Sequence, residues 1–306
     1  MGVCERNLPP NLSIFELTMR RPFIFAFVLL LTSLVAESQS FYAIRRERSL
    51  MGSVGMGSAN YFGELTNPRS LGAVKYGLNL GLEKYFTNRI GGRADFNWYR
   101  IGGDDAKADD DRVVRNLSFT SNNIEGSVSG VINLLPNGLR FYQRPVFNIY
   151  VWIGIGVTYI NPKAEYNGEM VALRPLQTEA VSYSNWQPII PFGGGLKAKV
   201  GPFFNVALEA GIRKTFTDYI DDISIAEYPD PAILSSDLSR ALSDRRSPPY
   251  NVPGDGVRGN PDADDWYFIV TGKVQYYLPF SFGGSHRKSY AQKRKSISYS
   301  KKARRR

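Results

Sequence analysis

The chain has 306 residues, enough for one or two domains, and it is rich in glycine and aromatic side chains. It contains one cysteine, Cys4, and one histidine, His286. A single cysteine excludes an intramolecular disulfide and a cysteine-rich metal site, and a single histidine argues against a His-based catalytic triad or zinc cluster. The formal net charge is +10 at pH 7.

The positive charge is concentrated at the C-terminus. Residues 283–306 contain ten Lys or Arg and no acidic residue, so the rest of the chain balances at 28 basic and 28 acidic side chains. We predict that this basic tail is disordered and binds anionic surfaces through its charge. Lipid head groups, cell-wall polymer and an acidic protein partner are the candidates, because an exported chain rarely meets nucleic acid.

The N-terminus has the parts of a secretory signal peptide. Met19-Arg20-Arg21 precedes an apolar run over residues 22–36, and cleavage after Ser40 would place the small residues Ser38 and Ser40 at the cleavage site. A single membrane helix is the alternative, but the run is shorter than the roughly 20 residues that a helical span needs. We predict a signal peptide over residues 1–40, with Met19 as a candidate true start, and an exported mature chain.

Residues 73–86 (AVKYGLNLGLEKYF) show the clearest strand pattern, with apolar and polar side chains alternating at a period of two. The apolar face comprises Val74, Tyr76, Leu78, Leu80 and Leu82, and the opposite face comprises Lys75, Gly77, Asn79, Gly81 and Glu83. One face is too apolar for water and the other carries ions. This combination indicates a barrel strand in a membrane, with the apolar face towards lipid.

Seven further segments are predicted to be strands, and six of them repeat the alternation. They are residues 50–62, 90–101, 119–134, 145–159, 189–200, 204–216 and 266–282. The alternation is blurred in residues 145–159, where Val, Ile, Thr and aromatic residues still favour a strand over a helix. Short turns follow the second, fourth and sixth strands, and the long connections are residues 63–71, 102–118, 161–187 and 217–264.

The alternation of short and long connections is typical of outer-membrane barrels, whose turns are periplasmic and whose longer loops are external. We predict an all-β fold over residues 41–282. It is an eight-stranded antiparallel transmembrane barrel of the outer membrane, like OmpA or OmpW, with both termini in the periplasm. A soluble lipocalin-like barrel also has eight strands, but it places apolar residues inside.

Charged residues on the polar strand faces are predicted to point into the barrel. They are Lys75, Glu83, Arg93, Asp95, Glu125, Lys197, Glu209, Arg213 and Lys273. An eight-stranded barrel is only just wide enough for its own side chains, and buried ions persist when they are paired. The set is either a narrow ion-conducting pore or a structural network that plugs the barrel, and the size of the interior favours the plug.

The sequence offers little support for catalysis or metal binding. Barrel enzymes that act on lipid A need a Ser with a base such as His, and His286 lies beyond the last strand. Acidic clusters at residues 104–111, 218–222 and 262–265 lie in external loops, where oxygen ligands could hold calcium. None has the EF-hand spacing, and acidic loops are usually solvated. We predict no enzymatic activity, no cofactor and no metal site.

Five segments together resemble a known family. They are residues 59–65 (ANYFGEL), 161–168 (NPKAEYNG), 173–179 (LRPLQTE), 190–197 (IPFGGGLK) and 209–224 (EAGIRKTFTDYIDDIS). This set resembles the DUF6089 family of outer-membrane barrels of Bacteroidota, over residues 50–282. The run from Thr217 to Ser224 is its most specific part. The family-motif loop comprises Thr217, Asp218, Tyr219, Asp221 and Asp222.

The resemblance implies an outer-membrane barrel and a role for it. The DUF6089 family includes PorG, a component of the type IX secretion system that is associated with the periplasmic ring proteins PorK and PorN. By this resemblance the chain is expected to be a PorG-like anchoring component, embedded in outer-membrane lipid and contacting PorK/PorN-like proteins. The alternative is a general envelope barrel of the OmpA or OmpW type, or a narrow small-solute pore.

Overall fold

The computed structural model describes residues 48–63, 65, 75–107, 110–137, 141–246, 257–261 and 264–279. The expected signal peptide at residues 1–40 and the expected basic tail at residues 283–306 lie outside the described residues. Cys4, Val74 and His286 also lie outside them.

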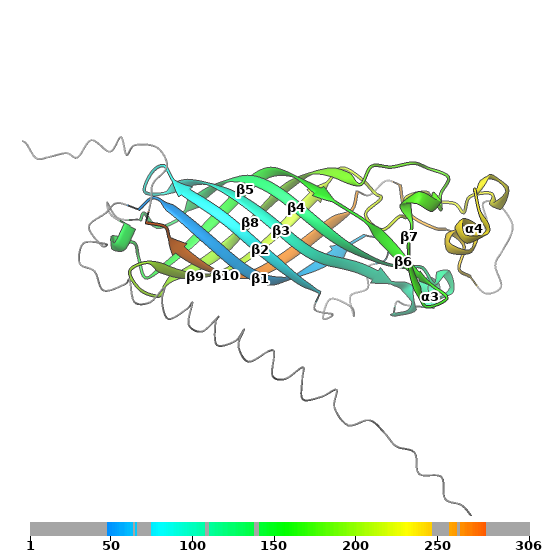
Figure 1. Cartoon of the computed structure of the whole chain (residues 1–306), viewed down its shortest axis with the longest axis horizontal. Helices are drawn as coiled ribbons and strands as arrows, with labels where there is room; N and C mark the ends of the chain where they lie inside the picture. Colours follow the sequence, from blue (N-terminus) through cyan, green and yellow to red (C-terminus); the bar gives the residue numbers. More distant parts are fainter. Residues whose placement is uncertain are drawn as a thin grey trace, which may run out of the picture.

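Eight long strands form a closed antiparallel barrel (Figure 1). They are β1 (Leu50–Phe62), β2 (Tyr76–Tyr85), β3 (Ile90–Asp104), β4 (Ser118–Asn133), β5 (Phe147–Tyr159), β8 (Trp186–Lys199), β9 (Phe204–Thr215) and β10 (Trp266–Tyr277). Each strand of this set pairs with the next along the chain. β1 also pairs with β10, from Met51 opposite Tyr277 to Phe62 opposite Trp266, which closes the barrel. The predicted eight-stranded antiparallel barrel is confirmed.

The outer face of the barrel is apolar. Leu80 on β2, Val128 on β4 and Ile155 on β5 point outward and are 54%, 63% and 73% exposed. A soluble protein rarely exposes a continuous apolar surface of this kind, whereas lipid accommodates it. The outer face is therefore that of a membrane-spanning barrel.

The alternation of β5, which is blurred in the sequence, is regular in the structure. Tyr150 and Trp152 point into the barrel and are buried, while Val151 and Ile153 are exposed. Large aromatic side chains on the inner face obscure the period of two, because both faces of the strand are then hydrophobic.

Aromatic side chains mark the two rims of the apolar surface. We call the rim with the long connections the loop end and the opposite rim the turn end. Ring pairs at the loop end are Tyr76 with Trp98 and Tyr159 with Trp186, and the turn end has Phe204 with Tyr276. The 13 residues of β5 extend about 40 Å, which at a tilt of roughly 40° crosses about 30 Å, the thickness of a bilayer core.

β3 and β4 continue beyond the loop-end rim. Their pairing runs on from Trp98 opposite Ile124 to Asp104 opposite Ser118. β6 (Pro162–Tyr166) pairs with β4, and β7 (Glu169–Ala172) pairs with β6, which extends the sheet past the barrel (Figure 1). The short helices η3 (Asp105–Lys107) and α3 (Asp110–Arg115) lie between β3 and β4.

Two connections that we expected to be irregular are partly regular. Residues 102–104 belong to β3, and residues 161–187 contain the β6–β7 hairpin and η5 (Arg174–Leu176). Asn167-Gly168 forms the hairpin turn, with φ angles of 52° and 84°. Positive φ at both positions is what a type I′ turn requires, and Asn-Gly is its preferred sequence. The signal was present, but the two strands are too short for a periodicity to reveal them.

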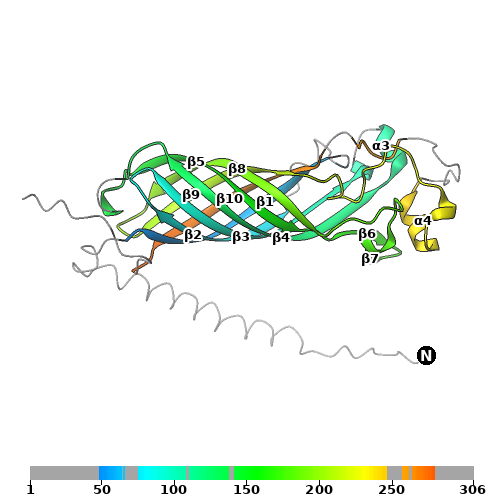
Figure 2. The same cartoon turned by 90° about the horizontal axis from the view of Figure 1, so that it is seen from above.

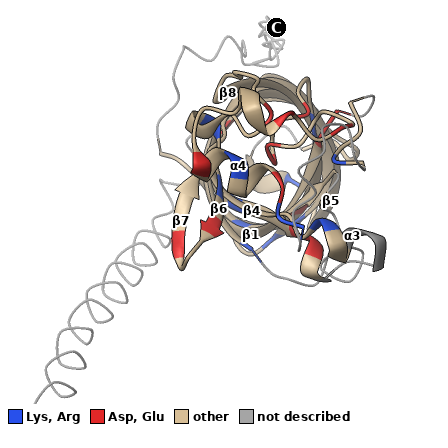
Figure 3. Cartoon of the chain, turned by 90° about the vertical axis from the view of Figure 1, so that its right-hand side faces the viewer, with Lys and Arg blue, Asp and Glu red and all other residues tan. Residues whose placement is uncertain are grey.

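The longest connection, residues 217–264, also contains short helices. These are η6 (Pro231–Ile233) and α4 (Asp237–Ser243). Seen along the barrel axis, α4 lies over the loop-end mouth (Figure 3). At the turn end, η4 (Phe141–Gln143) lies between β4 and β5. No helix in the described part of the chain is long and apolar enough to span a membrane.

A charge placed on the outer face tests the membrane-spanning arrangement. Val128→Arg, midway along the outer face of β4, should lower the free energy of unfolding by about 2–4 kcal/mol in phospholipid vesicles. Asn60 lies at the loop-end rim of β1. Asn60→Arg should therefore lower the free energy of unfolding by less than about 1 kcal/mol, because the charge can reach water there. Urea titration of the refolded barrel measures both values. Equal costs at the two positions would contradict the arrangement.

Candidate functional site

Eight of the nine charged residues expected in the lumen lie buried inside the barrel. They are Glu83, Arg93, Asp95, Glu125, Lys197, Glu209, Arg213 and Lys273. The structure places the ninth, Lys75, half-buried beside the start of β2, where its ammonium group donates to the carbonyl oxygen of Gly102. The eight buried side chains are four acids and four bases, so their formal charges cancel.

Four of these side chains form a ring of alternating charge, which we call the lumen square. Arg93 Nε lies 2.6 Å from Asp95 Oδ2, and Arg93 Nη1 lies 2.6 Å from Glu209 Oε1. Lys273 Nζ lies 2.8 Å from Glu209 Oε2 and 3.4 Å from Asp95 Oδ1. Each ion thus has two neighbours of opposite charge, which offsets the cost of removing it from water. The square joins β3 to β9 and β10 across the lumen.

A second buried pair is centred on Glu125, which is fully buried. Its Oε2 lies 3.4 Å from Arg213 Nε and accepts a hydrogen bond from Tyr267 OH at 2.9 Å. Its Oε1 accepts a hydrogen bond from Asn97 Nδ2 at 2.8 Å. This carboxylate is therefore satisfied by three different strands, β9, β10 and β3.

A third pair joins β8 to β2. Lys197 Nζ lies 3.6 Å from Glu83 Oε1 and donates to Tyr85 OH at 2.7 Å. The same ammonium group lies 4.5 Å from the ring centroid of Tyr150, a distance at which a cation is attracted to the ring face. Aromatic rings thus supplement a loosely spaced ion pair.

Aromatic side chains fill much of the remaining lumen, and the sequence analysis missed them. Tyr99 stacks on Tyr267 with their ring centroids 5.2 Å apart, and the Arg93 guanidinium lies 4.8 Å from the ring centroid of Trp152. Tyr99 occupies the same strand face as Arg93, six residues further along β3. Side chains an even number of residues away from an inward-pointing ion share its strand face. This spacing could have predicted that these rings point into the lumen.

The free space beside the lumen square is small. A cavity of about 10 Å³ lies beside the lumen square, and Asn79, Ser127 and Thr271 contribute to its lining. That volume has room for about one water molecule. The described lumen is a packed interior.

The loop end is closed by a hydrophobic cluster, which we call the cap. Side chains from the barrel mouth pack there against side chains from the long connections. The mouth contributes Ala59, Tyr61, Tyr99, Ile101, Phe119, Ile189, Tyr267 and Ile269, and the connections contribute Leu65, Leu117, Ala164, Leu173, Ile220, Ile223 and Leu242. Figure 2 shows α3, α4 and the β6–β7 hairpin gathered at this end.

The family-motif loop lies within the cap. Asp218, Asp221 and Asp222 are 9%, 1% and 2% exposed. Asp221 accepts hydrogen bonds from Tyr61 OH at 2.8 Å and from the backbone N–H of Ile223 at 3.0 Å. We expected such acidic clusters to be solvated, but these three carboxylates are buried. The expectation was wrong because the loop folds back onto the barrel mouth.

The remaining motif residues position this loop. Thr217 Oγ1 accepts a hydrogen bond from the backbone N–H of Tyr219 at 3.2 Å, and the Tyr219 ring stacks on Tyr183 with centroids 4.8 Å apart. Tyr183 OH then donates to Asp222 Oδ1 at 2.6 Å, and the Thr178 hydroxyl donates to the other oxygen of Asp222. The motif loop is thereby joined to the connection between β7 and β8.

Two buried arginines are paired with acids in the cap. Arg258 forms an ion pair with Glu179, which also accepts a hydrogen bond from the backbone N–H of Ser224 at 3.0 Å. Arg115 donates to both oxygens of Asp105, at 2.7 and 2.9 Å. Within the described ranges, no three His, Cys, Asp or Glu side chains form a group that could hold a metal ion.

Burial shifts the acid–base properties of the cap. It raises the pKa of Asp222 to about 6, although the nearby positive charge of Arg258 opposes the shift. Burial likewise raises the pKa of Glu179 above its ordinary value, again against Arg258. Folding of the cap therefore favours the protonated forms of these two groups more than water does.

The turn end is closed by aromatic rings and a buried arginine. Phe141 of η4 packs against Phe203 and Tyr277, with ring centroids 5.7 and 5.3 Å apart. Arg144 donates to four backbone carbonyl oxygens and to Asn205 Oδ1, at distances between 2.7 and 2.9 Å. These bonds fix the connection between β4 and β5 against the turn between β8 and β9.

The family model described as "Domain of unknown function (DUF6089)" matches residues 23–230. The chain belongs to the DUF6089 family. The matched range contains all five segments that carried the resemblance in the sequence, so the family assignment made from them is confirmed. No curated protein matches the chain.

Comparison with solved structures finds outer-membrane barrels. The chain is similar to Neisserial surface protein A, at 8% identity and a TM-score of 0.38, covering 75% of this chain and 97% of that one. It is also similar to a major outer membrane protein from Thermus thermophilus, at 14% identity and a TM-score of 0.39, covering 74% of this chain and 99% of that one. A third similar structure is the N-terminal β-barrel domain of Pseudomonas aeruginosa OprF, at 10% identity and a TM-score of 0.34, covering 76% of this chain and 100% of that one. We base the fold on the strand pairings of the chain itself.

Removing one corner of the lumen square should expose the cost of an unpaired ion. Glu209→Gln leaves Arg93 and Lys273 with Asp95 as their shared carboxylate, and should lower the free energy of unfolding by about 3–5 kcal/mol. Adding Lys273→Gln leaves a neutral Arg93–Asp95 pair, so the double variant should be more stable than Glu209→Gln alone. Urea unfolding in phospholipid vesicles measures both.

The matched control is Glu169→Gln on β7, where the same change in charge falls on an exposed side chain. It should leave the unfolding free energy within about 0.5 kcal/mol of the wild type. A double variant as unstable as the sum of its two single variants would contradict the pairing.

The cap should lose stability as the pH rises through the acid range. The pKa of Asp222 is about 6 in the cap against an ordinary 3.8, so the folded state binds more protons between these values. The contribution of Asp222 to the free energy of unfolding of the cap should fall by about 3 kcal/mol by pH 6 and stay at that level above pH 6. Hydrogen exchange of cap amides, corrected for intrinsic rates, measures it. Asp222→Asn should flatten the profile, and exposed Asp237→Asn should not. A profile unchanged by Asp222→Asn would refute this.

Proposed function

We propose that this protein is a non-enzymatic β-barrel of the outer membrane that anchors periplasmic components of the type IX secretion system. The observation that carries the proposal is the closed interior. Buried ions are paired across the lumen, and the cavity beside them has room for about one water molecule. Such a barrel serves as a fixed point in the membrane.

The closed interior favours an anchor over a small-solute pore. A hydrated ion or small solute would have to displace the lumen square, whose breakage leaves uncompensated charges in a dry interior. It would also have to pass the cap at the loop end and the Phe141, Phe203 and Tyr277 rings at the turn end. A general envelope barrel of the OmpA or OmpW type has the same closed interior, so the test must separate it from an anchor.

The two ends of the described chain lie together at the turn end. Met51, near the start of β1, is opposite Tyr277, at the end of β10. The backbone N–H of Leu278 donates to the carbonyl oxygen of Leu50 at 2.9 Å. In the proposed topology this end faces the periplasm, where the ring proteins lie, and the basic residues 283–306 follow this end in the sequence.

Membership of the DUF6089 family supports the specific role in secretion, because the resemblance to this family includes PorG. The proposed partners are PorK/PorN-like ring proteins and outer-membrane lipid, and no nucleic acid is involved. The proposed location is the outer membrane, reached after removal of the signal peptide. The absence of enzymatic activity is part of the proposal, since His286 is the single histidine.

The experiment is a deletion strain complemented with tagged variants of the full chain. The wild-type protein, purified from solubilised outer membrane, should retain the ring proteins and restore secretion. A chain that ends at residue 279 should retain less of them, because it lacks the basic tail. Asp237→Asn, at an exposed position of the loop-end helix α4, is the control and should behave as the wild type.

Normal secretion in the deletion strain, with no ring protein in the pull-down, would refute the anchoring role and leave a general envelope barrel. Altered lipid A in that strain, restored by the wild-type gene, would refute the non-enzymatic assignment.

A further inference from the structure

Buried arginines show a difference between the two ends of the barrel. The described part of the chain has seven of them: Arg48, Arg93, Arg115, Arg144, Arg213, Arg246 and Arg258. Five form ion pairs with a carboxylate. Among the described residues, Arg48 and Arg144 have none, and both lie at the turn end.

These two arginines are held by neutral groups. Arg144 donates to carbonyl and amide oxygens, and burial lowers the pKa of its guanidinium below the ordinary value. Arg48 Nη1 donates to the carbonyl oxygen of Tyr277 at 2.8 Å, and its guanidinium lies 4.3 Å from the ring centroid of Phe203. Arg48 Nε is buried and has no hydrogen-bond partner among the residues that the structure describes. Two positive charges at this end therefore lack a counter-charge within the described protein.

The described connections of the turn end are basic. These connections, residues 86–89, 134–137, 141–146 and 200–203, contain no Asp or Glu. Lys84, Arg89 and Lys199 lie in or beside them, and Lys199 Nζ donates to the carbonyl oxygen of Tyr142 at 2.8 Å. The loop end, by contrast, carries acidic and basic segments side by side (Figure 3).

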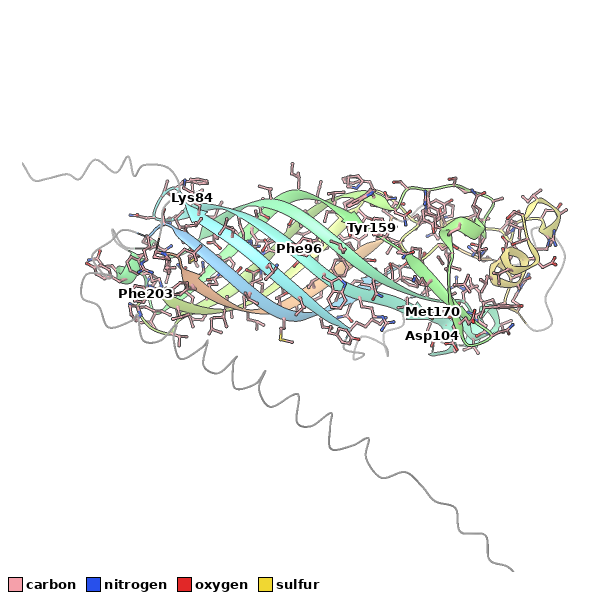
Figure 4. All side chains as sticks on the ribbon, in the orientation of Figure 1. Lys84, Phe96, Asp104, Tyr159, Met170 and Phe203 are labelled. Atoms are coloured by element: carbon pink, nitrogen blue, oxygen red, sulfur yellow. The ribbon has the colours of Figure 1, made fainter. Side chains whose placement is uncertain are left out.

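The turn-end connections also expose large apolar side chains. Phe86, Leu134, Val146 and Val200 are 64%, 60%, 74% and 61% exposed. Side chains of this kind are unfavourable in water and favourable beside acyl chains. The turn end therefore lies at the depth of the lipid head groups, whereas β3 and β4 carry the loop end well beyond the membrane. Figure 4 shows Lys84 and Phe203 at the turn end and Asp104 and Met170 at the other.

We propose that the turn end binds the phosphate groups of anionic membrane phospholipids, with Lys84, Arg89 and Lys199 at the contact and Arg48 and Arg144 adding positive potential behind it. Basic side chains at head-group depth reach phosphates while their aliphatic stems stay against apolar surface. The exposed apolar side chains of the same turns then lie against the acyl chains. Phospholipid supplies both chemistries at once, with its anionic groups and its acyl chains at adjoining depths. This surface does not depend on the role in secretion.

The test is lipid retention by the full chain in nanodiscs of phosphatidylcholine, with and without phosphatidylglycerol, read by native mass spectrometry. The wild type should retain phosphatidylglycerol preferentially, and salt should weaken the preference. The triple variant Lys84→Gln, Arg89→Gln and Lys199→Gln should lose about fivefold in preference for each charge removed. Because the basic tail is present in both proteins, the difference between them reports the barrel end.

The matched control removes three charges at the loop end: Lys163→Gln, Arg174→Gln and Lys214→Gln. It should retain the wild-type preference. A turn-end variant that folds and keeps the full preference, or a control that loses as much, would overturn the proposal. Full competition by inorganic phosphate would assign the site to free phosphate and overturn the lipid as its source. Binding of polyglutamate that the turn-end substitutions abolish, without any lipid preference, would overturn it in favour of an acidic protein partner.

Discussion

Pairing of ions inside the barrel is the interaction on which the rest of the structure depends. Lipid outside requires an apolar outer face, so the polar side chains of every strand must point inward. Eight strands leave little room there, and a single unpaired ion in that space would cost several kcal/mol. The lumen square meets this constraint by giving each charge two opposite neighbours. It also joins strands that are far apart around the barrel, which fixes how they face each other.

The two ends solve a different problem, the closure of an open mouth. At the loop end the motif loop turns its acids inward, where Tyr61 and Tyr183 supply hydrogen bonds and apolar residues of the long connections fill the mouth. At the turn end, Arg144 uses neutral oxygens to hold η4 against the barrel. One end is thus a folded head outside the membrane, and the other is flush with the head groups. The ends of the described chain and the basic connections lie at the turn end, and we therefore propose that the ring proteins and phospholipid bind there.

The strands were predictable because a membrane barrel imposes one rule, a period of two, along its whole wall. The same rule placed eight of the nine lumen ions. It failed at Lys75, which lies just before β2 begins, and it was obscured where Tyr150 and Trp152 replace polar residues on the inner face. The period of two could not predict the cap, because the cap is built partly from the connections between strands. Burial of Asp222 depends on a partner 44 residues away in the sequence, Thr178, and no periodicity connects the two. Asn167-Gly168 was a local signal there, and it marks the turn of the β6–β7 hairpin.

Single-channel recording of the full-length protein in planar phospholipid bilayers tests the closed interior most directly. The paired lumen and the two closed mouths predict a baseline current, with no steady steps attributable to the barrel. Steady, large conductance steps that appear with the folded protein would contradict the account. They would mean that the lumen square yields to solvent and that the barrel is a pore.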